Sequence, residues 1–134
     1  MEDLLRAAQQ AQENAYAPYS GYRVGAALRS SSGQVYAGCN VENVSYGLTL
    51  CAERNALAAM VTAGETRWTE IVIITRDGGT PCGACLQVLL EFVEDARNAS
   101  VICASESSGP GPSRMLAEFL PLGFRSPEVG RTES

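Results

Sequence analysis

The segment LCAERNALAAM, residues 50–60, has the composition of a helix, with Ala, Leu and Met recurring and neither Gly nor Pro inside it. Its first turn nevertheless carries Cys51, Glu53 and Arg54, which are a thiol, an acid and a base. The positive end of a helix dipole favours negative charge at this place. We therefore interpret the start of this helix, expected over residues 51–63, as a chemical site that its apolar remainder anchors in the core.

A second helix start, PCGAC at residues 81–85, also carries reactive side chains. Leucines recur at helical spacing after it and predict a helix over residues 82–96. Between the two helices, TEIVIIT (residues 69–75) is a β-branched, apolar run that predicts a strand buried on both faces. In a right-handed βαβ arrangement the two helix N-termini lie side by side. Three thiols would then converge on one point: Cys51, Cys82 and Cys85.

The other segments place these helices in an α/β fold. The expected elements are a helix at 2–15, strands at 22–30, 34–42 and 99–105, a hairpin loop at 31–33, a loop at 106–113 and a last helix at 114–120 capped by Ser113. Their order, α-β-β-α-β-α-β-α, predicts a three-layer α/β/α fold with a mixed central sheet and helices on both faces. We expect one domain over residues 1–134, with a flexible tail at 125–134.

Composition narrows the classes of function. The net charge of −5 and the pI of about 4.7 disfavour a nucleic-acid partner, because such partners attract basic surfaces. The sequence has no run of about 20 apolar residues and no apolar segment typical of a signal peptide, so we expect a cytoplasmic protein without a membrane span. Its five cysteines are then expected to stay reduced. With no histidine, the chain cannot be a hydrolase that uses a histidine base.

Three converging thiols predict a metal site. Zinc prefers sulfur ligands, at about 2.3 Å, in a tetrahedron. Because no histidine can complete a closed site, one position stays open, which is typical of catalytic zinc, and a water bound there has a pKa near 7. Glu53 lies two residues after a ligand, so it can approach that position and move a proton. Arg54 is expected to donate hydrogen bonds to the sulfurs, unless it is an ordinary surface arginine.

The cysteines also admit other interpretations. CxxC alone also fits a redox motif or half of a structural zinc site, and any single cysteine can be a buried apolar residue. The joint spacing, with Glu53 after the first cysteine and Pro81 before the second, argues against these interpretations. Cys39 and Cys103 fall in expected strands and are interpreted as core residues.

The motifs resemble those of a known family. CAE followed by PCGAC is similar to the signature of the zinc-dependent cytidine deaminases in its three-cysteine variant. The resemblance to the small nucleoside deaminases extends from about residue 3 to 124, through YAPYSGYRVGAAL (16–28), GCNVENVSYGLTLCAERNAL (38–57), PCGACLQVLLEF (81–92) and AEFLPLGF (117–124). It implies a sheet of about five strands, one zinc ion per subunit held by Cys51, Cys82 and Cys85, Glu53 as proton shuttle, and a homotetramer with shared active sites.

The resemblance also implies substrate contacts. Asn40 and Glu42 match the pair that holds the ribose hydroxyls, and Ala52 offers backbone groups to the base. Tyr22 stands where the family usually has a phenylalanine near the pyrimidine, and Phe124 matches an aromatic residue that reaches into a neighbour's site. Leu86 stands where the family often has an arginine, which would leave Arg54 as the cation near the sulfurs.

The implied reaction is the hydrolysis of cytidine and 2′-deoxycytidine to uridine and 2′-deoxyuridine, with release of ammonia, in pyrimidine salvage. Zinc-bound hydroxide would attack the ring carbon that bears the amine, and Glu53 would shuttle protons. Three alternatives remain: a deaminase of polynucleotides, a deaminase of nucleoside antibiotics, and a non-catalytic zinc-stabilised binding module. The net negative charge disfavours a polynucleotide deaminase, and the presence of Asn40 and Glu42 disfavours an antibiotic deaminase. The position of Glu53 disfavours a non-catalytic binding module. The sequence does not choose between cytidine and deoxycytidine.

Overall fold

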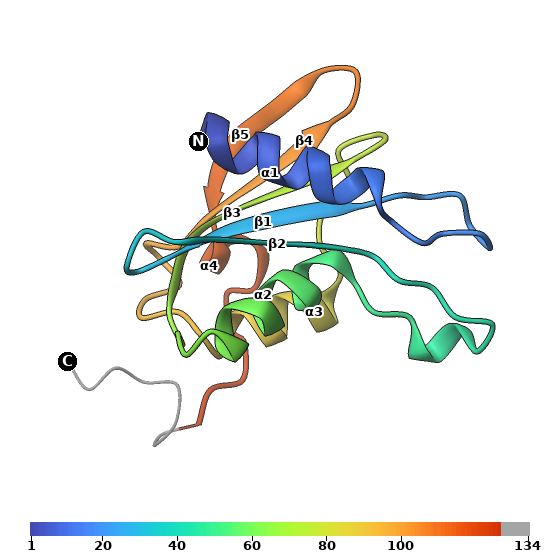
Figure 1. Cartoon of the computed structure of the whole chain (residues 1–134). Helices are drawn as coiled ribbons and strands as arrows, with labels where there is room; N and C mark the ends of the chain where they lie inside the picture. Colours follow the sequence, from blue (N-terminus) through green and yellow to red (C-terminus); the bar gives the residue numbers. More distant parts are fainter. Residues whose placement is uncertain (127–134) are drawn as a thin grey trace.

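The computed structural model describes residues 1–126, so the predicted tail at 125–134 falls mostly outside the described residues. A five-stranded sheet with the order β2-β1-β3-β4-β5 forms the middle of three layers (Figure 1). The helices are α1 (Glu2–Glu13), η1 (Tyr46–Leu48), α2 (Ala52–Thr62), α3 (Gly83–Leu90) and α4 (Leu116–Phe119). The strands are β1 (Gly25–Ser30), β2 (Val35–Cys39), β3 (Trp68–Thr75), β4 (Ser100–Ser105) and β5 (Gly109–Met115).

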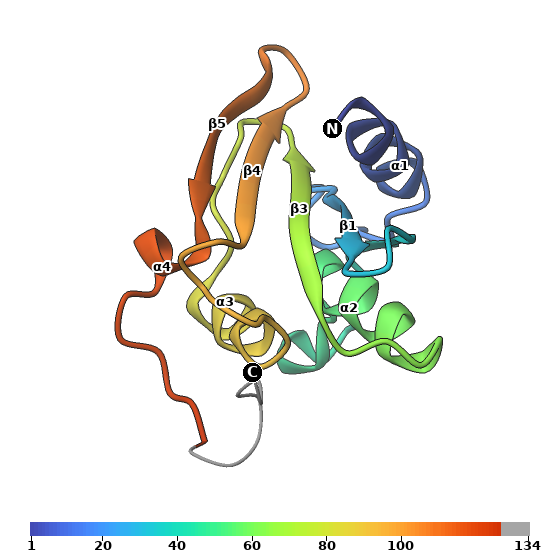
Figure 2. The same cartoon turned by 90° about the vertical axis from the view of Figure 1, so that its left-hand side faces the viewer.

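The sheet is mixed and covered on both faces, as predicted. Strands β3 and β4 are parallel, and the other neighbouring pairs are antiparallel. Helix α1 covers one face, whereas α2, α3 and α4 cover the other (Figure 2). Since side chains alternate along a strand, β3 sends Ile71 and Ile73 to the α2–α3 side and Val72 and Ile74 to the α1 side. The prediction of a strand buried on both faces is therefore confirmed.

Two glycines allow helices to approach the sheet closely. A Cβ added at Gly25 in β1 would lie 2.0 Å from the carbonyl oxygen of Ala8 in α1. A Cβ added at Gly38 in β2 would lie 2.5 Å from the backbone nitrogen of Ala56 in α2. Because Gly38 has no side chain, α2 packs directly against β2, two residues before Asn40. Asn40 and the start of α2 therefore line the same cavity.

Helix α3 ends at Leu90, so the prediction of a helix up to residue 96 is wrong. The carbonyl oxygen of Phe92 accepts the backbone N–H of Trp68 at 3.0 Å, which ties this part of the chain to the start of β3. Val93 keeps the expected apolar spacing and is fully buried, although it lies outside the helix. The apolar pattern thus identified the buried side of this segment but not its backbone conformation.

The predictions for residues 106–120 are also wrong in part. The expected loop at 106–113 contains a turn and most of β5, and helix α4 begins at Leu116 with Met115 as its N-cap. Ser113 does not cap a helix, because its hydroxyl is hydrogen-bonded to that of Ser100 across the β4–β5 pair at 2.6 Å. Pro110 and Pro112 are tolerated because β5 is an edge strand of the sheet. This strand completes the expected number of about five.

Within residues 1–126, no helix combines the length and the apolar character that crossing a bilayer requires.

Candidate active site

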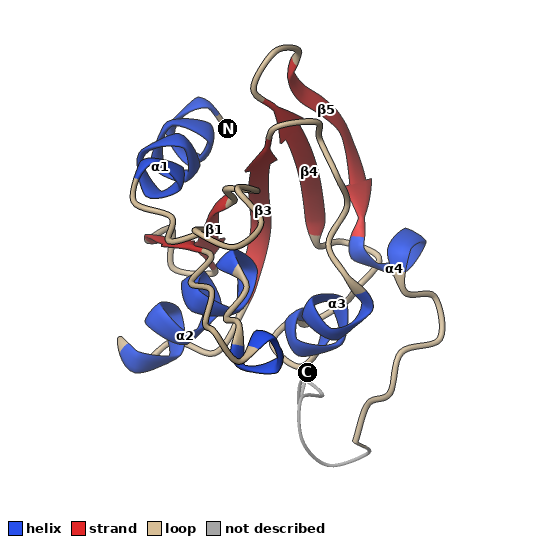
Figure 3. Cartoon of the chain, turned by 90° about the vertical axis from the view of Figure 1, so that its right-hand side faces the viewer, coloured by secondary structure: helices blue, strands red, loops and turns tan. Residues whose placement is uncertain are grey.

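The starts of α2 and α3 bring three thiols together. These helices lie side by side on one face of the sheet (Figure 3). Cys51 is the N-cap of α2, Cys82 is the N-cap of α3, and Cys85 is buried in the first turn of α3. Their sulfur atoms all lie within 4.8 Å of one another. The predicted convergence of the three cysteines is therefore confirmed.

The thiol cluster fits a zinc ion. Tetrahedral zinc with Zn–S bonds of about 2.3 Å holds its sulfurs about 3.8 Å apart, so the observed spacing needs only small adjustments. Both N-caps also place their sulfurs at the positive ends of helix dipoles, which favours the thiolates that zinc requires. Donor type, number and spacing thus agree with a zinc site that has three protein ligands.

Arg54 is half-buried and contacts the thiol cluster. Its Nη2 donates a hydrogen bond to the Sγ of Cys51 at 3.1 Å, which confirms the predicted contact. Its Nε is buried and has no hydrogen-bond partner among residues 1–126. The Cys85 thiol and the Arg54 guanidinium together lower the pKa of Cys51 to about 5. The protein therefore holds a thiolate here at neutral pH, as a metal ligand requires.

Glu53 lies beside the thiols in the first turn of α2. Only 6% of its surface is exposed, and burial raises the pKa of its carboxyl group. Its Oε1 lies 3.9 Å from the Sγ of Cys85. A buried carboxyl group with a raised pKa holds a proton more readily than an exposed one, which suits a general acid or base.

A small cavity of about 160 Å³ opens onto the thiols and Glu53. Tyr22, Asn40 and Ala52, predicted from the sequence, also line it. The lining further includes residues that the sequence interpretation missed: Val24, Thr49, Ile73, Thr75, Gly79 and Thr80. Gly79 and Thr80 could have been found, because they lie in the loop that leads directly to Cys82.

Asn40 fixes one wall of the cavity. Its Nδ2 donates to the carbonyl oxygen of Tyr22 at 2.8 Å, and its Oδ1 accepts from the backbone N–H of Val24 at 3.0 Å. Asn40 is almost fully buried, with 7% of its surface exposed. Its amide therefore holds the segment that enters β1, and through it the position of Tyr22.

Glu42 and Phe124 do not line this cavity. The Oε1 of Glu42 accepts backbone N–H groups of Tyr19 at 2.9 Å and Ser20 at 3.2 Å, and its Oε2 accepts the Ser20 hydroxyl. The hydrogen bond from the Ser20 hydroxyl is also the main reason why the pKa of Glu42 is lowered. Phe124 is 79% exposed, and Gln87 holds its backbone through two hydrogen bonds of 2.7 and 3.1 Å.

The remaining residues singled out from the sequence lie away from the reactive groups or at their margin. Leu86 is 6% exposed and packs in the core on the α2–α3 side of the sheet. Cys39 and Cys103 are half-buried rather than fully buried. Burial raises the pKa of Cys103.

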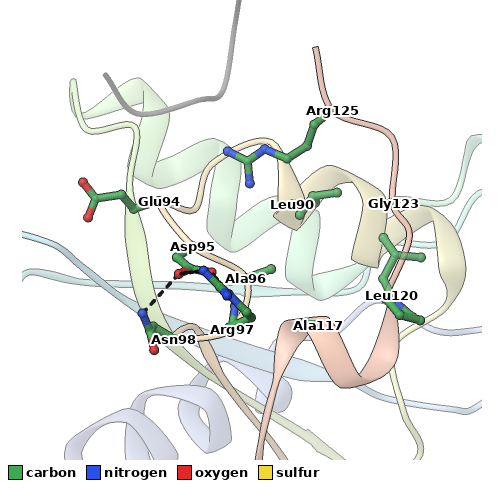
Figure 4. Close-up of a pocket in the computed structure, with 11 residues that line it drawn as sticks. Leu90, Glu94, Asp95, Ala96, Arg97, Asn98, Ala117, Leu120, Gly123 and Arg125 are labelled. Carbon is green, nitrogen blue, oxygen red and sulfur yellow. Dashed lines mark hydrogen bonds and ion pairs between the residues drawn. The ribbon is translucent and has the colours of Figure 1, made fainter. Parts of the chain in front are cut away.

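A larger hollow of about 680 Å³ lies between the loop after α3 and residues 120–125 (Figure 4). Its polar lining includes the ion pair of Arg97 with Asp95, at 3.0 Å. None of the three clustered thiols lines this hollow, and neither does Glu53. The chemistry of the side chains therefore identifies the smaller cavity as the candidate active site.

Residues 1–103 match the family described as "Cytidine and deoxycytidylate deaminase zinc-binding region". The chain belongs to the cytidine and deoxycytidylate deaminase family. Among curated proteins, it is 50% identical over 126 residues to the cytidine deaminase of Mycobacterium tuberculosis, covering 92% of this deaminase chain and 89% of that protein. It is 34% identical over 131 residues to the cytidine deaminase of Sporosarcina psychrophila, covering 96% and 94%.

Solved structures agree with this assignment. The cytidine deaminase of Burkholderia pseudomallei has a TM-score of 0.84 and 38% identity, covering 92% of this chain and 98% of that one. The cytidine deaminase of M. tuberculosis has a TM-score of 0.78 and 39% identity, covering 93% and 97%. The three-layer fold of this deaminase is therefore that of solved cytidine deaminases.

Proposed function

We propose that this deaminase hydrolyses cytidine and 2′-deoxycytidine to uridine and 2′-deoxyuridine and releases ammonia. One observation carries the proposal: the sulfurs of three cysteines lie within 4.8 Å of one another, and Glu53 lies beside them in the wall of the same small cavity. The relatives named above are cytidine deaminases, which supports a pyrimidine nucleoside as substrate.

Cys51, Cys82 and Cys85 would hold one zinc ion per subunit. When bound, zinc supplies a Lewis acid that lowers the pKa of a water molecule and so provides a nucleophile at neutral pH. Three thiolates carry more negative charge than one zinc ion neutralises. Arg54, which donates to Cys51, offsets part of this charge.

Glu53 moves the protons of the reaction. Hydrolysis adds water to the ring carbon that bears the amine and expels ammonia, so protons must reach both the adjacent ring nitrogen and the leaving amine. Glu53 is the buried carboxyl group in the cavity wall, and burial raises its pKa. We assign to it two proton transfers, each of which takes one proton from the added water: the first goes to the ring nitrogen, where uridine keeps it, and the second goes to the amine, which leaves as ammonia.

The remaining contacts position the substrate. Tyr22 packs beside the pyrimidine ring, and Ala52 offers backbone groups to the base. Asn40 and Glu42 hold the ribose hydroxyls. They do so with the donor and acceptor positions that are not used in hydrogen bonds within the chain. The Asn40 Nδ2 carries a second N–H, and the Glu42 carboxylate has further lone pairs.

The active enzyme would be a homotetramer with shared active sites. Typical ligand pockets have volumes of about 300–1,000 Å³, and the volume of this cavity is smaller. We therefore infer that one chain encloses only part of a nucleoside. Exposed apolar side chains are available to complete it, among them Tyr46 at 72%, Leu48 at 65% and Phe124 at 79% exposure. In this proposal Phe124 enters the cavity of a neighbouring copy.

The setting that fits this activity is pyrimidine salvage in the cytoplasm. The net charge of −5 supports a small nucleoside over a polynucleotide as substrate.

Ammonia release from cytidine, 2′-deoxycytidine and a cytosine-containing oligonucleotide tests the proposal. We expect release from both nucleosides, none from the oligonucleotide, and loss of activity after a zinc chelator that returns when zinc is added back. A chain that contains zinc but releases no ammonia from either nucleoside would contradict the proposal.

A further inference from the structure

The hydroxyl of Tyr22 makes a contact that a phenylalanine could not make. The ring of Tyr22 lines the cavity, and its Oη donates a hydrogen bond to the Oδ1 of Asp77 at 2.6 Å. The guanidinium of Arg76 lies over the same ring, with Cζ 5.2 Å from the ring centroid. Tyr22 is therefore held on its hydroxyl and on one ring face by two neighbouring residues of the loop at 76–81.

Asp77 also orders that loop. Its Oδ1 accepts the backbone N–H of Gly79 at 3.2 Å and the hydroxyl of Thr75 at 3.4 Å. The Oγ1 of Thr75, the last residue of β3, accepts the N–H groups of Gly78 at 2.8 Å and Gly79 at 3.0 Å. The carboxylate thus joins the Tyr22 hydroxyl to the end of a central strand. Hydrogen bonds to an ionised acceptor are stronger than neutral ones.

The loop and the Tyr22 hydroxyl are in close contact. A Cβ added at Gly79 would lie 2.8 Å from the Oη of Tyr22. Gly79 and Thr80 line the cavity, and the chain then continues through Pro81 into Cys82. The Tyr22–Asp77 hydrogen bond therefore connects the two chain segments that form this side of the cavity, one entering β1 and one entering α3.

We propose that Asp77 is a positioning residue for the pyrimidine: through the Tyr22 hydroxyl, it holds the Tyr22 ring and the loop at 76–81 in the geometry that binds the base. This inference rests on the proposed function, because it assigns the base to the cavity. Asp77 does not line the candidate active site and acts through Tyr22.

Steady-state kinetics with cytidine test the role in binding. Tyr22→Phe and Asp77→Ala are each expected to raise KM about tenfold, the equivalent of about 1.4 kcal/mol for a charge-assisted hydrogen bond, with kcat within about twofold. The KM of the double variant is expected to be no higher than that of the single variant with the higher KM, because both changes remove the same bond. Asp77→Asn keeps an acceptor oxygen and should restore KM to within about threefold of the unsubstituted protein.

Hydrogen exchange of the Gly79 amide provides a measurement that does not depend on turnover. We expect exchange to become about tenfold faster in Tyr22→Phe and in Asp77→Ala, because each variant loosens the loop. Asp95→Ala is the matched control. Asp95 also accepts a backbone N–H within a loop, from Arg97 at 2.9 Å, but it lies outside the candidate active site. It should change neither KM nor the exchange of Gly79.

Each outcome decides a different point. If the increases in KM of the two single variants multiply in the double variant, the link between Tyr22 and Asp77 is overturned. Faster Gly79 exchange with an unchanged KM would overturn the positioning role and leave Asp77 as a loop-stabilising residue. An unsubstituted protein that does not deaminate cytidine would overturn the proposed function and the assignment of the pyrimidine, while the exchange result would still decide whether Asp77 orders the loop.

Discussion

The Oε1 of Glu53 lies 3.9 Å from the Sγ of Cys85, so a buried carboxyl group touches the thiol cluster. The two side chains come from different helices, α2 and α3, whose starts meet beneath the central sheet. This contact links the proton-transfer group to the metal ligands in the proposed mechanism. It also separates the site from a purely structural zinc site, which has no need of a carboxyl group in a cavity wall.

The first prediction concerns Glu53. Glu53→Gln keeps the size of the side chain and its place in α2 but removes the group that carries the proton. We expect turnover of cytidine to fall by at least about 10²-fold, with the zinc content unchanged. Metal analysis and an ammonia assay on the same sample measure both quantities. Retention of most of the activity would exclude Glu53 as the proton shuttle.

The second prediction concerns Arg54. Arg54→Ala removes the hydrogen bond to Cys51 and the positive charge beside the thiolates. We expect zinc affinity to fall about 10–100-fold, as for other residues that support metal ligands. Competition with a chelator of known affinity measures this, with Arg67→Ala as the control, because Arg67 is also half-buried but lies just before β3, outside the thiol cluster. Equal zinc affinities in the two variants would contradict the role of Arg54.

The third prediction concerns the packing of α2 on β2. Gly38→Ala places a Cβ 2.5 Å from the backbone nitrogen of Ala56, and backbone cannot move aside as a side chain can. We expect the free energy of unfolding to fall by about 1–3 kcal/mol or more, as measured by denaturant titration. Gly47→Ala is the matched control, because nothing lies within 4 Å of the added Cβ. Similar losses in both variants would show that α2 does not press on β2 as described.

The fourth prediction concerns acid stability. Arg29 Nη2 donates to both carboxylate oxygens of Asp3 at 2.8 Å, and this contact lowers the pKa of Asp3 to about 2. Because this pKa lies below the value of about 3.9 for an unfolded chain, ionised Asp3 stabilises the fold above about pH 4. That stabilisation is lost as the pH falls through about 2.

Asp3→Asn should therefore be less stable than the unsubstituted protein at pH 7, and the difference should close between about pH 4 and pH 2. Thermal unfolding across this range measures it. Glu2→Gln, in the same turn of α1 but outside this ion pair, should give a smaller difference. A difference for Asp3→Asn that stays constant down to pH 2 would contradict the assignment.

The sequence predicted the thiol cluster because local and topological rules agree there. Cys51 and Cys82 precede helical apolar patterns, and a right-handed crossover between parallel strands leaves few arrangements of the two helix starts. The sequence did not predict β5, because its glycines and prolines are typical of a loop and its strand conformation depends on pairing with β4. Nor did it predict the end of α3, after which the backbone N–H of Trp68 donates a hydrogen bond to the carbonyl oxygen of Phe92.

The surroundings of the thiol cluster were predicted less completely. Asp77 has no motif of its own, and its importance depends on a contact with Tyr22, which lies 55 residues away in the sequence. Glu42 was expected to hold the ribose hydroxyls together with Asn40, and the sequence did not predict that backbone N–H groups of Tyr19 and Ser20 also bind its carboxylate. Both positions are set by contacts between loops, which a sequence pattern does not encode.

X-ray absorption spectroscopy at the zinc edge, on protein purified with zinc and analysed for metal content, tests the central claim most directly. The account predicts one zinc ion per chain with three sulfur neighbours at about 2.3 Å and one lighter ligand. It further predicts the loss of bound zinc when Cys51, Cys82 or Cys85 is replaced by alanine, but not when Cys39 is replaced. A folded chain that binds no zinc, or a zinc ion without three sulfur neighbours, would contradict it.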